Sequence, residues 1–174
     1  MIQKIIIFIL DIFDFFHKRK ILNFLKSENL KKINIFFDIG AHKGETIKLF
    51  SKNFDISQIY SFEASPINFK ILEKNINKLK IEGVILENIA LSSCNQKLYL
   101  KQVKESSSST FSKLNFESKY LKKKKRILNL FSNNDYFTNI EIQTKTLKDY
   151  IISKNIKEID FLKIDTEGHE MEIL

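Results

Sequence analysis

A chain of 174 residues is long enough for one domain with a real core. Its hydrophobic content of 43% and its 16 phenylalanines argue against disorder. Its single cysteine excludes an internal disulfide framework and any metal site built from several cysteines. The formal net charge is +8, but 27 of the 29 basic residues are lysine. Heavy use of Lys, Ile, Asn and Phe is typical of an AT-rich coding sequence, which raises the isoelectric point without a selected partner. We therefore expect no nucleic-acid partner.

Residues 1–32 are predicted to be an N-terminal helical segment. Its apolar stretch, residues 5–16, contains Asp11 and Asp14, and is too short and too charged to span a bilayer. No small-residue cleavage site follows it, which argues against a secretory signal. Two interpretations stay open: residues 1–20 lie on a membrane surface as an amphipathic helix, or the helix packs on the domain or on a second subunit. We favour packing, and expect a cytoplasmic protein in which membrane-peripheral contact and homo-oligomerisation remain alternatives.

The next segment, residues 33–63, has the pattern of a βαβ unit. An apolar run at residues 35–39 leads into a loop that contains Gly40 and Gly44, and a helical apolar pattern follows. A second apolar run then ends at Glu63. Such a unit places an adenosine at the carboxyl ends of parallel strands, where glycines admit the ligand to the backbone and an acid can accept both ribose hydroxyls.

The glycine spacing decides between cofactors. Dinucleotide-binding folds use G-x-G-x-x-G, which places a pyrophosphate on a helix N-terminus. Here the pattern is Asp38-x-Gly40-x-x-x-Gly44, and an acid at the first position would repel a pyrophosphate. The pattern instead suits a cofactor with a cationic centre and no phosphate, such as S-adenosylmethionine. A nicotinamide-dependent enzyme is a poor alternative, and a plain tight turn with a buried, hydrogen-bonded Asp38 is the structural one.

The rest of the chain continues the alternation of strands and helices. A helix is predicted from Ser65 as N-cap and Pro66 as first residue, with a core stripe at Phe69, Leu72, Ile76 and Leu79. Strands are predicted at 84–86, 97–103 (antiparallel in character), 140–144 and 158–165, with a short helix at 147–152. Residues 104–139 give no clear pattern, and the basic run 122–126 is interpreted as a solvated helix face.

Acidic residues crowd the end of the strand predicted at 158–165. Ligands and catalysts in open α/β sheets collect at carboxyl strand ends, so Asp165 and Glu167 could orient a hydroxyl, act as base or bind a divalent metal. The alternative is that they cap the first turn of a final helix. His169 is equally compatible with a surface position in that helix.

Six motifs in this order resemble the FkbM family of S-adenosylmethionine-dependent methyltransferases across residues 35–174. They are Phe37–Gly44 (FDIGAHKG), Ser61–Pro66 (SFEASP), Asn88–Ser92 (NIALS), the serines before Thr110-Phe111, Thr146–Asp149 (TLKD) and Ile159–Glu170 (IDFLKIDTEGHE). The last block is the most specific of the six.

The resemblance implies an α/β, Rossmann-like class I methyltransferase fold, a parallel sheet with flanking helices, over residues 33–174. It implies methylation of a hydroxyl on a small molecule, sugar, glycan or secondary metabolite. It also assigns roles to residues: Asp38, Gly40 and Gly44 at the methionine end of the cofactor, Glu63 at the ribose, Asn88 and Ala90 at the adenine edge, and Asp165 and Glu167 as catalytic residues near the transferred methyl. Asp165 is the only candidate metal ligand.

Two departures from the family pattern matter. His42 stands where the family usually has Asn, and the sequence stops at Leu174, within the helix expected after the fourth strand. A complete sheet of this type has three further strands, so we expect a fragment whose last strand is an exposed, aggregation-prone edge and whose activity alone is doubtful. The alternative to an active enzyme is a non-catalytic cofactor-binding remnant or interaction module.

Overall fold

The structure is a computed structural model that describes residues 18–28, 30–103, 109–110 and 137–174. The chain divides into two units; the described residues 18–31 belong to one, and those from 32 onward to the other. In the first unit, residues 18–27 form a helix. None of the helices in the described residues is long and apolar enough to cross a membrane. The predictions for residues 1–17 and for the basic run at 122–126 lie outside the described residues.

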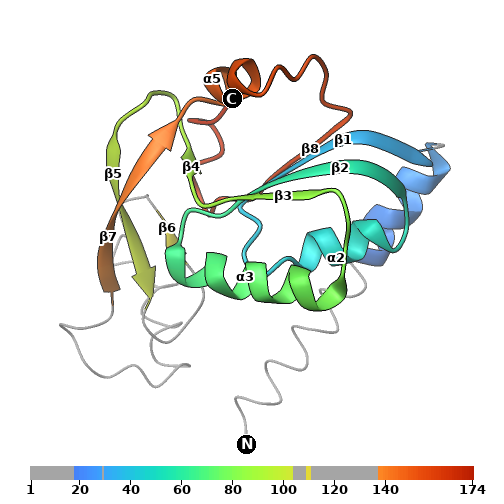
Figure 1. The fold of residues 1–174 in the computed structure, drawn as a ribbon, viewed down its shortest axis with the longest axis horizontal. Coiled ribbons are helices and arrows are strands. Elements are labelled where there is room, and N and C mark those ends of the chain that lie inside the picture. The colour runs from blue at the N-terminus through green and yellow to red at the C-terminus, as the bar shows by residue number, and fades with distance from the viewer. Residues whose placement is uncertain (1–17, 29, 104–108, 111–136) are drawn as a thin grey trace, which may run out of the picture. The chain divides into compact units, whose positions relative to one another are not determined.

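The second unit is built around a parallel sheet with the strand order β3-β2-β1-β8 (Figure 1). Its strands are β1 (Lys32–Ile39), β2 (Asp55–Phe62), β3 (Val84–Glu87) and β8 (Phe161–Ile164). Helices α2 (Glu45–Ser51) and α3 (Pro66–Leu79) cover one face, and α5 (Leu147–Ser153) lies on the other. The predicted α/β class is confirmed. The chain order reverses between β1 and β8, which is the switch point where open α/β sheets bind ligands.

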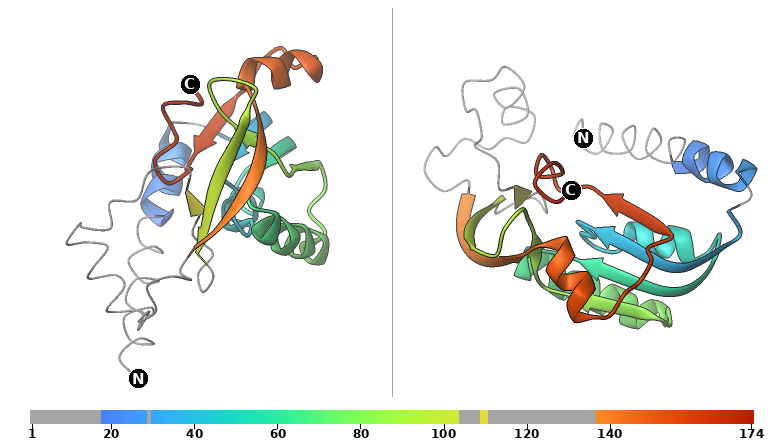
Figure 2. Two further views of the ribbon diagram at one scale, coloured as in Figure 1. Left: turned by 90° about the vertical axis from the view of Figure 1, so that its left-hand side faces the viewer. Right: turned by 90° about the horizontal axis from the view of Figure 1, so that it is seen from above.

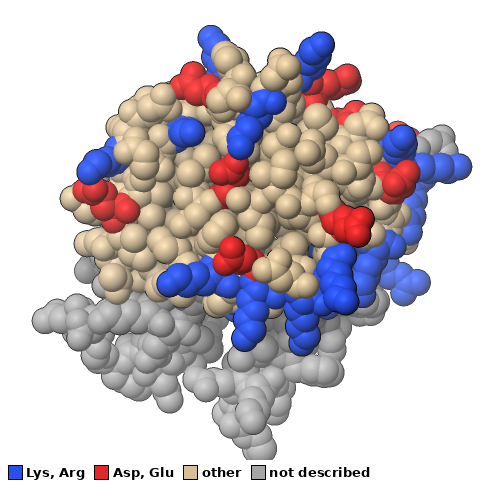
Figure 3. Space-filling model, viewed as in Figure 1, with Lys and Arg blue, Asp and Glu red and all other residues tan. Residues whose placement is uncertain are grey.

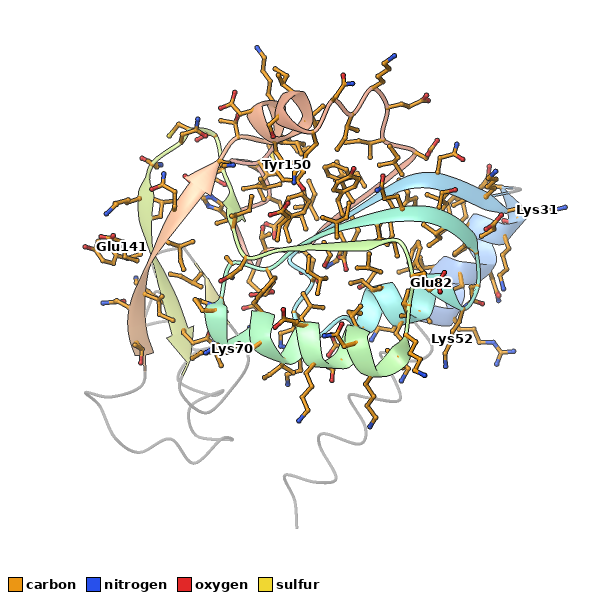
Figure 4. All side chains as sticks on the ribbon, viewed as in Figure 1. Lys31, Lys52, Lys70, Glu82, Glu141 and Tyr150 are labelled. Carbon is orange, nitrogen blue, oxygen red and sulfur yellow. The ribbon has the colours of Figure 1, made fainter. Side chains whose placement is uncertain are left out.

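The two faces of β1 bury different aromatic sets, because successive side chains of a strand point to opposite faces. On the helix α2 face, Phe36 stacks on Phe50 with ring centroids 5.0 Å apart. On the other face, Phe37 packs against Tyr150 of α5 in an edge-to-face arrangement with centroids 6.2 Å apart. Figure 4 labels Tyr150 where α5 meets the sheet. Covering both faces explains why β1 and β2 read as continuous apolar runs.

A second, smaller sheet is inserted in the chain between β3 and β8. It has the order β4-β7-β5-β6, with β4 (Ala90–Leu91), β5 (Lys97–Val103), β6 (Ser109–Thr110) and β7 (Phe137–Lys145). The antiparallel pairing predicted for 97–103 is confirmed, since β5 runs antiparallel to β7. In the views of Figures 1 and 2 this sheet lies beyond the carboxyl ends of the parallel strands. It therefore borders the region where a ligand is expected.

Helix α3 begins as predicted but buries a different stripe. Ser65 Oγ accepts a hydrogen bond from the Asn68 N–H, and Pro66 is the first helical residue. Leu72 and Ile76 are buried, whereas Leu79 is exposed and the polar Asn68 is buried in its place. The last turn of the helix therefore runs past the edge of the core. Helix α3 exposes Lys70, Lys74 and Lys78 at four-residue intervals. On the face shown in Figure 3, basic side chains border the lower edge.

The end of the chain differs most from expectation. The strand predicted at 158–165 is shorter, Phe161–Ile164, and half-buried at the edge of the parallel sheet in the described residues. The prediction of a helix after this strand is wrong, because residues 165–174 form turns. Glu167 and Gly168 have φ of +52° and +100°, in the left-handed region that a continuing helix cannot use. Glu170 closes this loop instead, since its carboxylate accepts hydrogen bonds from the N–H groups of Thr166 and Gly168.

Candidate functional site

A row of polar side chains crosses the carboxyl end of the parallel sheet. The strand register places Asp38 of β1 opposite Ser61 of β2 on one side and opposite Lys163 of β8 on the other. Asp38 and Ser61 are fully buried, and among the described residues neither Asp38 Oδ2 nor Ser61 Oγ has a hydrogen-bond partner. Buried polar atoms are almost always paired, so unpaired ones at a switch point indicate a ligand or an ordered water.

Asp38 is held beside a cation. Lys163 Nζ lies 3.0 Å from Asp38 Oδ1 and donates a hydrogen bond of 2.8 Å to the carbonyl oxygen of Gly40. Burial raises the pKa of the Asp38 carboxyl, and the Lys163 ammonium opposes that rise. The site thus keeps a desolvated carboxylate next to its own counter-ion.

The glycine loop, residues 40–44, depends on its two glycines for packing. Gly40 has φ +78°, and a Cβ there would collide with the carbonyl oxygen of Asp165. Gly44 has φ +86°, and a Cβ there would lie 2.9 Å from Cδ1 of Leu72 on α3. Both positions require left-handed backbone, which glycine adopts without strain. The glycines therefore let the loop approach β8 and α3 closely.

The backbone N–H groups of the glycine loop are all engaged within the protein. Gly40 and Ala41 donate to the carbonyl oxygen of Phe62, Gly44 to that of Ala41, His42 to the carboxylate of Glu63, and Lys43 to that of Glu45. Partial burial raises the pKa of Glu45, but hydrogen bonds from His42 and backbone N–H groups outweigh it and lower the pKa to about 2. An acid of the protein itself thus occupies the start of α2, and this loop offers no free N–H for a phosphate.

Glu63 joins the glycine loop to the start of α3. Its Oε2 accepts the His42 N–H at 2.8 Å, and its Oε1 accepts the Ser65 N–H at 2.9 Å. Only 5% of the residue is exposed. Burial raises the pKa of Glu63, and the hydrogen bonds from Ser65 and His42 counter the rise. The Asn68 side chain also hydrogen-bonds to this carboxylate, so three donors of the protein hold it in place and about one of its roughly four acceptor sites is left for a ligand hydroxyl.

The two residues predicted at the adenine edge lie in different surroundings. Asn88 is exposed, and its amide donates to the carbonyl oxygens of Glu63 at 2.7 Å and Ala64 at 3.3 Å. This bridge fixes the end of β2 against the end of β3. Ala90 is buried in an apolar cluster with Leu100 and Ile142, so its side chain belongs to the core of the second sheet.

The predicted catalytic acids lie in the β8 loop, which we define as residues 165–170. The Asp165 side chain is 73% exposed, with Oδ2 4.0 Å from Lys163 Nζ. Glu167 is also exposed. In the described part of the chain, no three His, Cys, Asp or Glu side chains lie close enough together to hold a metal ion. Asp165 is thus brought to the Asp38–Lys163 pair, as expected for residues at the carboxyl ends of neighbouring parallel strands.

The sequence matches the family profile described as Methyltransferase FkbM domain over residues 38–174. The chain belongs to the FkbM methyltransferase family. A solved structure, the methyltransferase FkbM from Methylobacillus flagellatus KT, is 13% identical with a TM-score of 0.49; the match covers 82% of this chain and 28% of that one. The chain thus spans little more than a quarter of that protein's length. A search of curated proteins found no match.

Within this FkbM domain, sequence reasoning missed two contacts. The direct pairing of Lys163 with Asp38 follows from the β1–β8 register, which cannot be predicted from the local sequence. The sequence was equally compatible with a surface position for His169. In the structure this residue is only 9% exposed, and its Nε2 lies 3.0 Å from Oγ of Ser92 at the end of β4. That contact ties the β8 loop to the second sheet. The apolar residues before Ser92 were the available signal for this contact, but nothing in the sequence identified His169 as the partner of Ser92.

Proposed function

We propose that this protein is an S-adenosylmethionine-dependent O-methyltransferase that methylates a hydroxyl of a sugar, a glycan or a secondary metabolite. The observation that carries the proposal is the charge pattern of the switch point. The glycine loop gives its N–H groups to the protein, and the buried oxygen of Asp38 without a partner faces the same strand end. This arrangement suits a cationic ligand and disfavours an anionic one. Membership of the FkbM methyltransferase family supports the reaction type.

The side chains at the strand ends fit such a cofactor. Asp38 Oδ2 would accept from the α-ammonium group, and the Glu63 carboxylate, held by His42 and Ser65, would accept from the ribose hydroxyls. Asn88 would border the adenine from the end of β3, with Ala90 behind it. When bound, the cofactor supplies an electrophilic methyl group on its sulfonium. The glycine loop and Glu63 would hold that end of the cofactor in a fixed position, which is a large part of catalysis by proximity.

Asp165 is the residue best placed to act on the acceptor. Its carboxylate is exposed, follows β8 directly and lies on the same side of the sheet end as Asp38 and Lys163. There, Asp165 Oδ2 would accept the proton of an acceptor hydroxyl. Glu167, two residues later in the same loop, would orient the acceptor.

A binding comparison tests the proposal. Isothermal titration calorimetry with S-adenosylhomocysteine and with NAD should give binding of the first and none of the second. Methyl transfer should then be measured with S-adenosylmethionine labelled in its methyl group and a panel of sugar and polyol acceptors. Binding without transfer would favour the alternative, a non-catalytic cofactor-binding remnant or interaction module. Binding of NAD instead would refute the proposal.

A further inference from the structure

Lys163 contacts three parts of the candidate site at the switch point. Its Nζ lies 3.0 Å from Asp38 Oδ1, 2.8 Å from the carbonyl oxygen of Gly40 and 4.0 Å from Asp165 Oδ2. Its side chain is 21% exposed, against 0% for Asp38 and 73% for Asp165. The ammonium thus links a buried carboxylate, the glycine loop and an exposed carboxylate. The roles assigned to the other strand-end residues leave this lysine without one.

The backbone register of β1 and β8 sets the contact between Lys163 and Asp38. Asp38 and Lys163 are paired Cα partners in the β1–β8 register, so both side chains project from the same face. The second bond, to Gly40, anchors the ammonium over the turn that begins the glycine loop. Oδ1 of Asp38 is therefore oriented by Lys163, while Oδ2 is left without a hydrogen-bond partner among the described residues.

The groups around Asp38 act on its ionisation in opposite directions. Lys163 favours its carboxylate form, whereas burial and the nearby acids Asp165 and Glu45 oppose it. Nδ1 of His42, in the glycine loop, lies 3.4 Å from Oε1 of Glu45. Removing the Lys163 charge would leave a fully buried acid near two others, and such an acid becomes neutral. A neutral Asp38 could no longer balance a ligand ammonium.

We propose that Lys163 is a positioning residue that keeps Asp38 ionised and aimed at the ammonium group of the cofactor, and so sets affinity for the amino-acid end of that cofactor. The inference rests on the proposed function. It predicts an effect confined to one end of the ligand, because the adenosine end would be held by Glu63 and Asn88, which directly follow β2 and β3. A residue that only stabilised the fold would weaken both ends alike.

Two ligands separate those ends. S-adenosylhomocysteine has both, and 5′-methylthioadenosine has the adenosine and the sulfur but no amino-acid group. In Lys163→Met, calorimetry at pH 7 should show S-adenosylhomocysteine binding roughly tenfold weaker or more, with 5′-methylthioadenosine changed by less than about twofold. Lys163→Arg should restore part of the affinity. Lys154→Met is the matched control: Lys154 pairs with Glu87 at the same 3.0 Å distance, and this variant should bind both ligands normally.

The pH dependence provides a readout that a structural role would not move. In Lys163→Met, S-adenosylhomocysteine affinity should rise as the pH is raised, since a higher pH favours the ionised form of Asp38, while 5′-methylthioadenosine affinity stays flat. Asp38→Asn should show the same selective loss without the pH dependence, and covers the case in which Lys163→Met does not fold. Equal loss for both ligands, or no loss for S-adenosylhomocysteine, would overturn the role of Lys163. Failure of the unaltered protein to bind either ligand would instead overturn the proposed function.

Discussion

The two acidic strand ends of this sheet are built in opposite ways. At β1 and β2, Asp38 and Glu63 are buried, burial raises the pKa of each carboxyl, and backbone or lysine donors hold them in place. At β8, Asp165 and Glu167 are exposed. The buried acids are held in fixed positions, whereas the exposed acids can contact molecules of different shapes. We therefore expect the β1–β2 side to bind the cofactor and the β8 side to bind the methyl acceptor.

This contrast changes what substitutions should do. On the β1–β2 side the proposed ligand contacts come from residues that also hold the glycine loop, so binding and stability should be lost together. On the β8 side an exposed carboxylate contributes little to packing, so turnover should change with little change in stability. Each prediction below tests one half of that contrast.

The largest effect is expected at Gly40. A Cβ at this position would collide with the Asp165 carbonyl oxygen, so even alanine should disrupt the glycine loop. Gly40→Ala combines left-handed strain with a backbone clash and should cost about 2–4 kcal/mol of unfolding free energy. Binding of S-adenosylhomocysteine should be lost as well. Chemical denaturation and calorimetry measure the two quantities.

Gly83→Ala is the control for Gly40. Gly83 also has positive φ, +71°, and a Cβ there would lie 2.6 Å from the Ser57 carbonyl oxygen, at the start of β3. It should destabilise the protein to a similar degree but leave binding intact when measured well below the unfolding transition. If Gly40→Ala binds normally, the glycine loop is only a structural turn.

The next effect is at Asp165, on the open side. Asp165→Asn keeps the size of the side chain and removes the base, so turnover should fall by roughly 10²–10⁴-fold. The affinity for S-adenosylhomocysteine and the unfolding midpoint should change little, because the side chain is 73% exposed. Activity with Mg²⁺ and with chelator separates a base from a metal ligand, since only a metal ligand predicts loss with chelator. Full turnover in the variant would place the chemistry elsewhere.

A smaller effect is expected at Glu63, on the buried side. Glu63→Ala removes the carboxylate for the ribose, and charge-assisted hydrogen bonds of about 1.5–3 kcal/mol each predict roughly tenfold weaker S-adenosylhomocysteine binding or more. The same change also frees the His42 N–H, so stability should fall too.

Asn75→Ala is the matched control, because Asn75 tethers the same loop by donating to the Lys43 carbonyl oxygen at 2.9 Å. It should lower stability with little loss of affinity. An unchanged dissociation constant in folded Glu63→Ala would reject the ribose assignment.

How far the sequence predicted this molecule depends on the range of each contact. The unit β1–α2–β2–α3 followed from local signals: apolar periodicity, the glycines, and the Ser65–Pro66 cap, all of which act within a few residues. The Lys163–Gly40 bond spans 123 residues and the His169–Ser92 contact spans 77. Neither is encoded by local pattern, because both depend on which strands become neighbours. The missing final helix has a related cause, since Glu170 forms loop hydrogen bonds that compete with helix formation.

The smallest effect is expected at Glu170, whose carboxylate accepts hydrogen bonds within the β8 loop. Hydrogen bonds from the N–H groups of Gly168 and Thr166 lower the pKa of Glu170 to about 2, against an ordinary value of 4.5. A depressed pKa means that Glu170 stabilises the folded state fully above about pH 4.5, and that this contribution disappears as the pH falls toward 2. Glu170→Gln should therefore lower the unfolding midpoint at pH 7 by a few degrees at most, since solvent screens the exposed loop. The gap between the variant and the unaltered protein should narrow by pH 3, whereas Glu158→Gln, at an exposed acid before β8, should show no such convergence. A gap of equal size at both pH values would mean that the charge of Glu170 does not hold the β8 loop, and that the turn geometry alone presents Asp165.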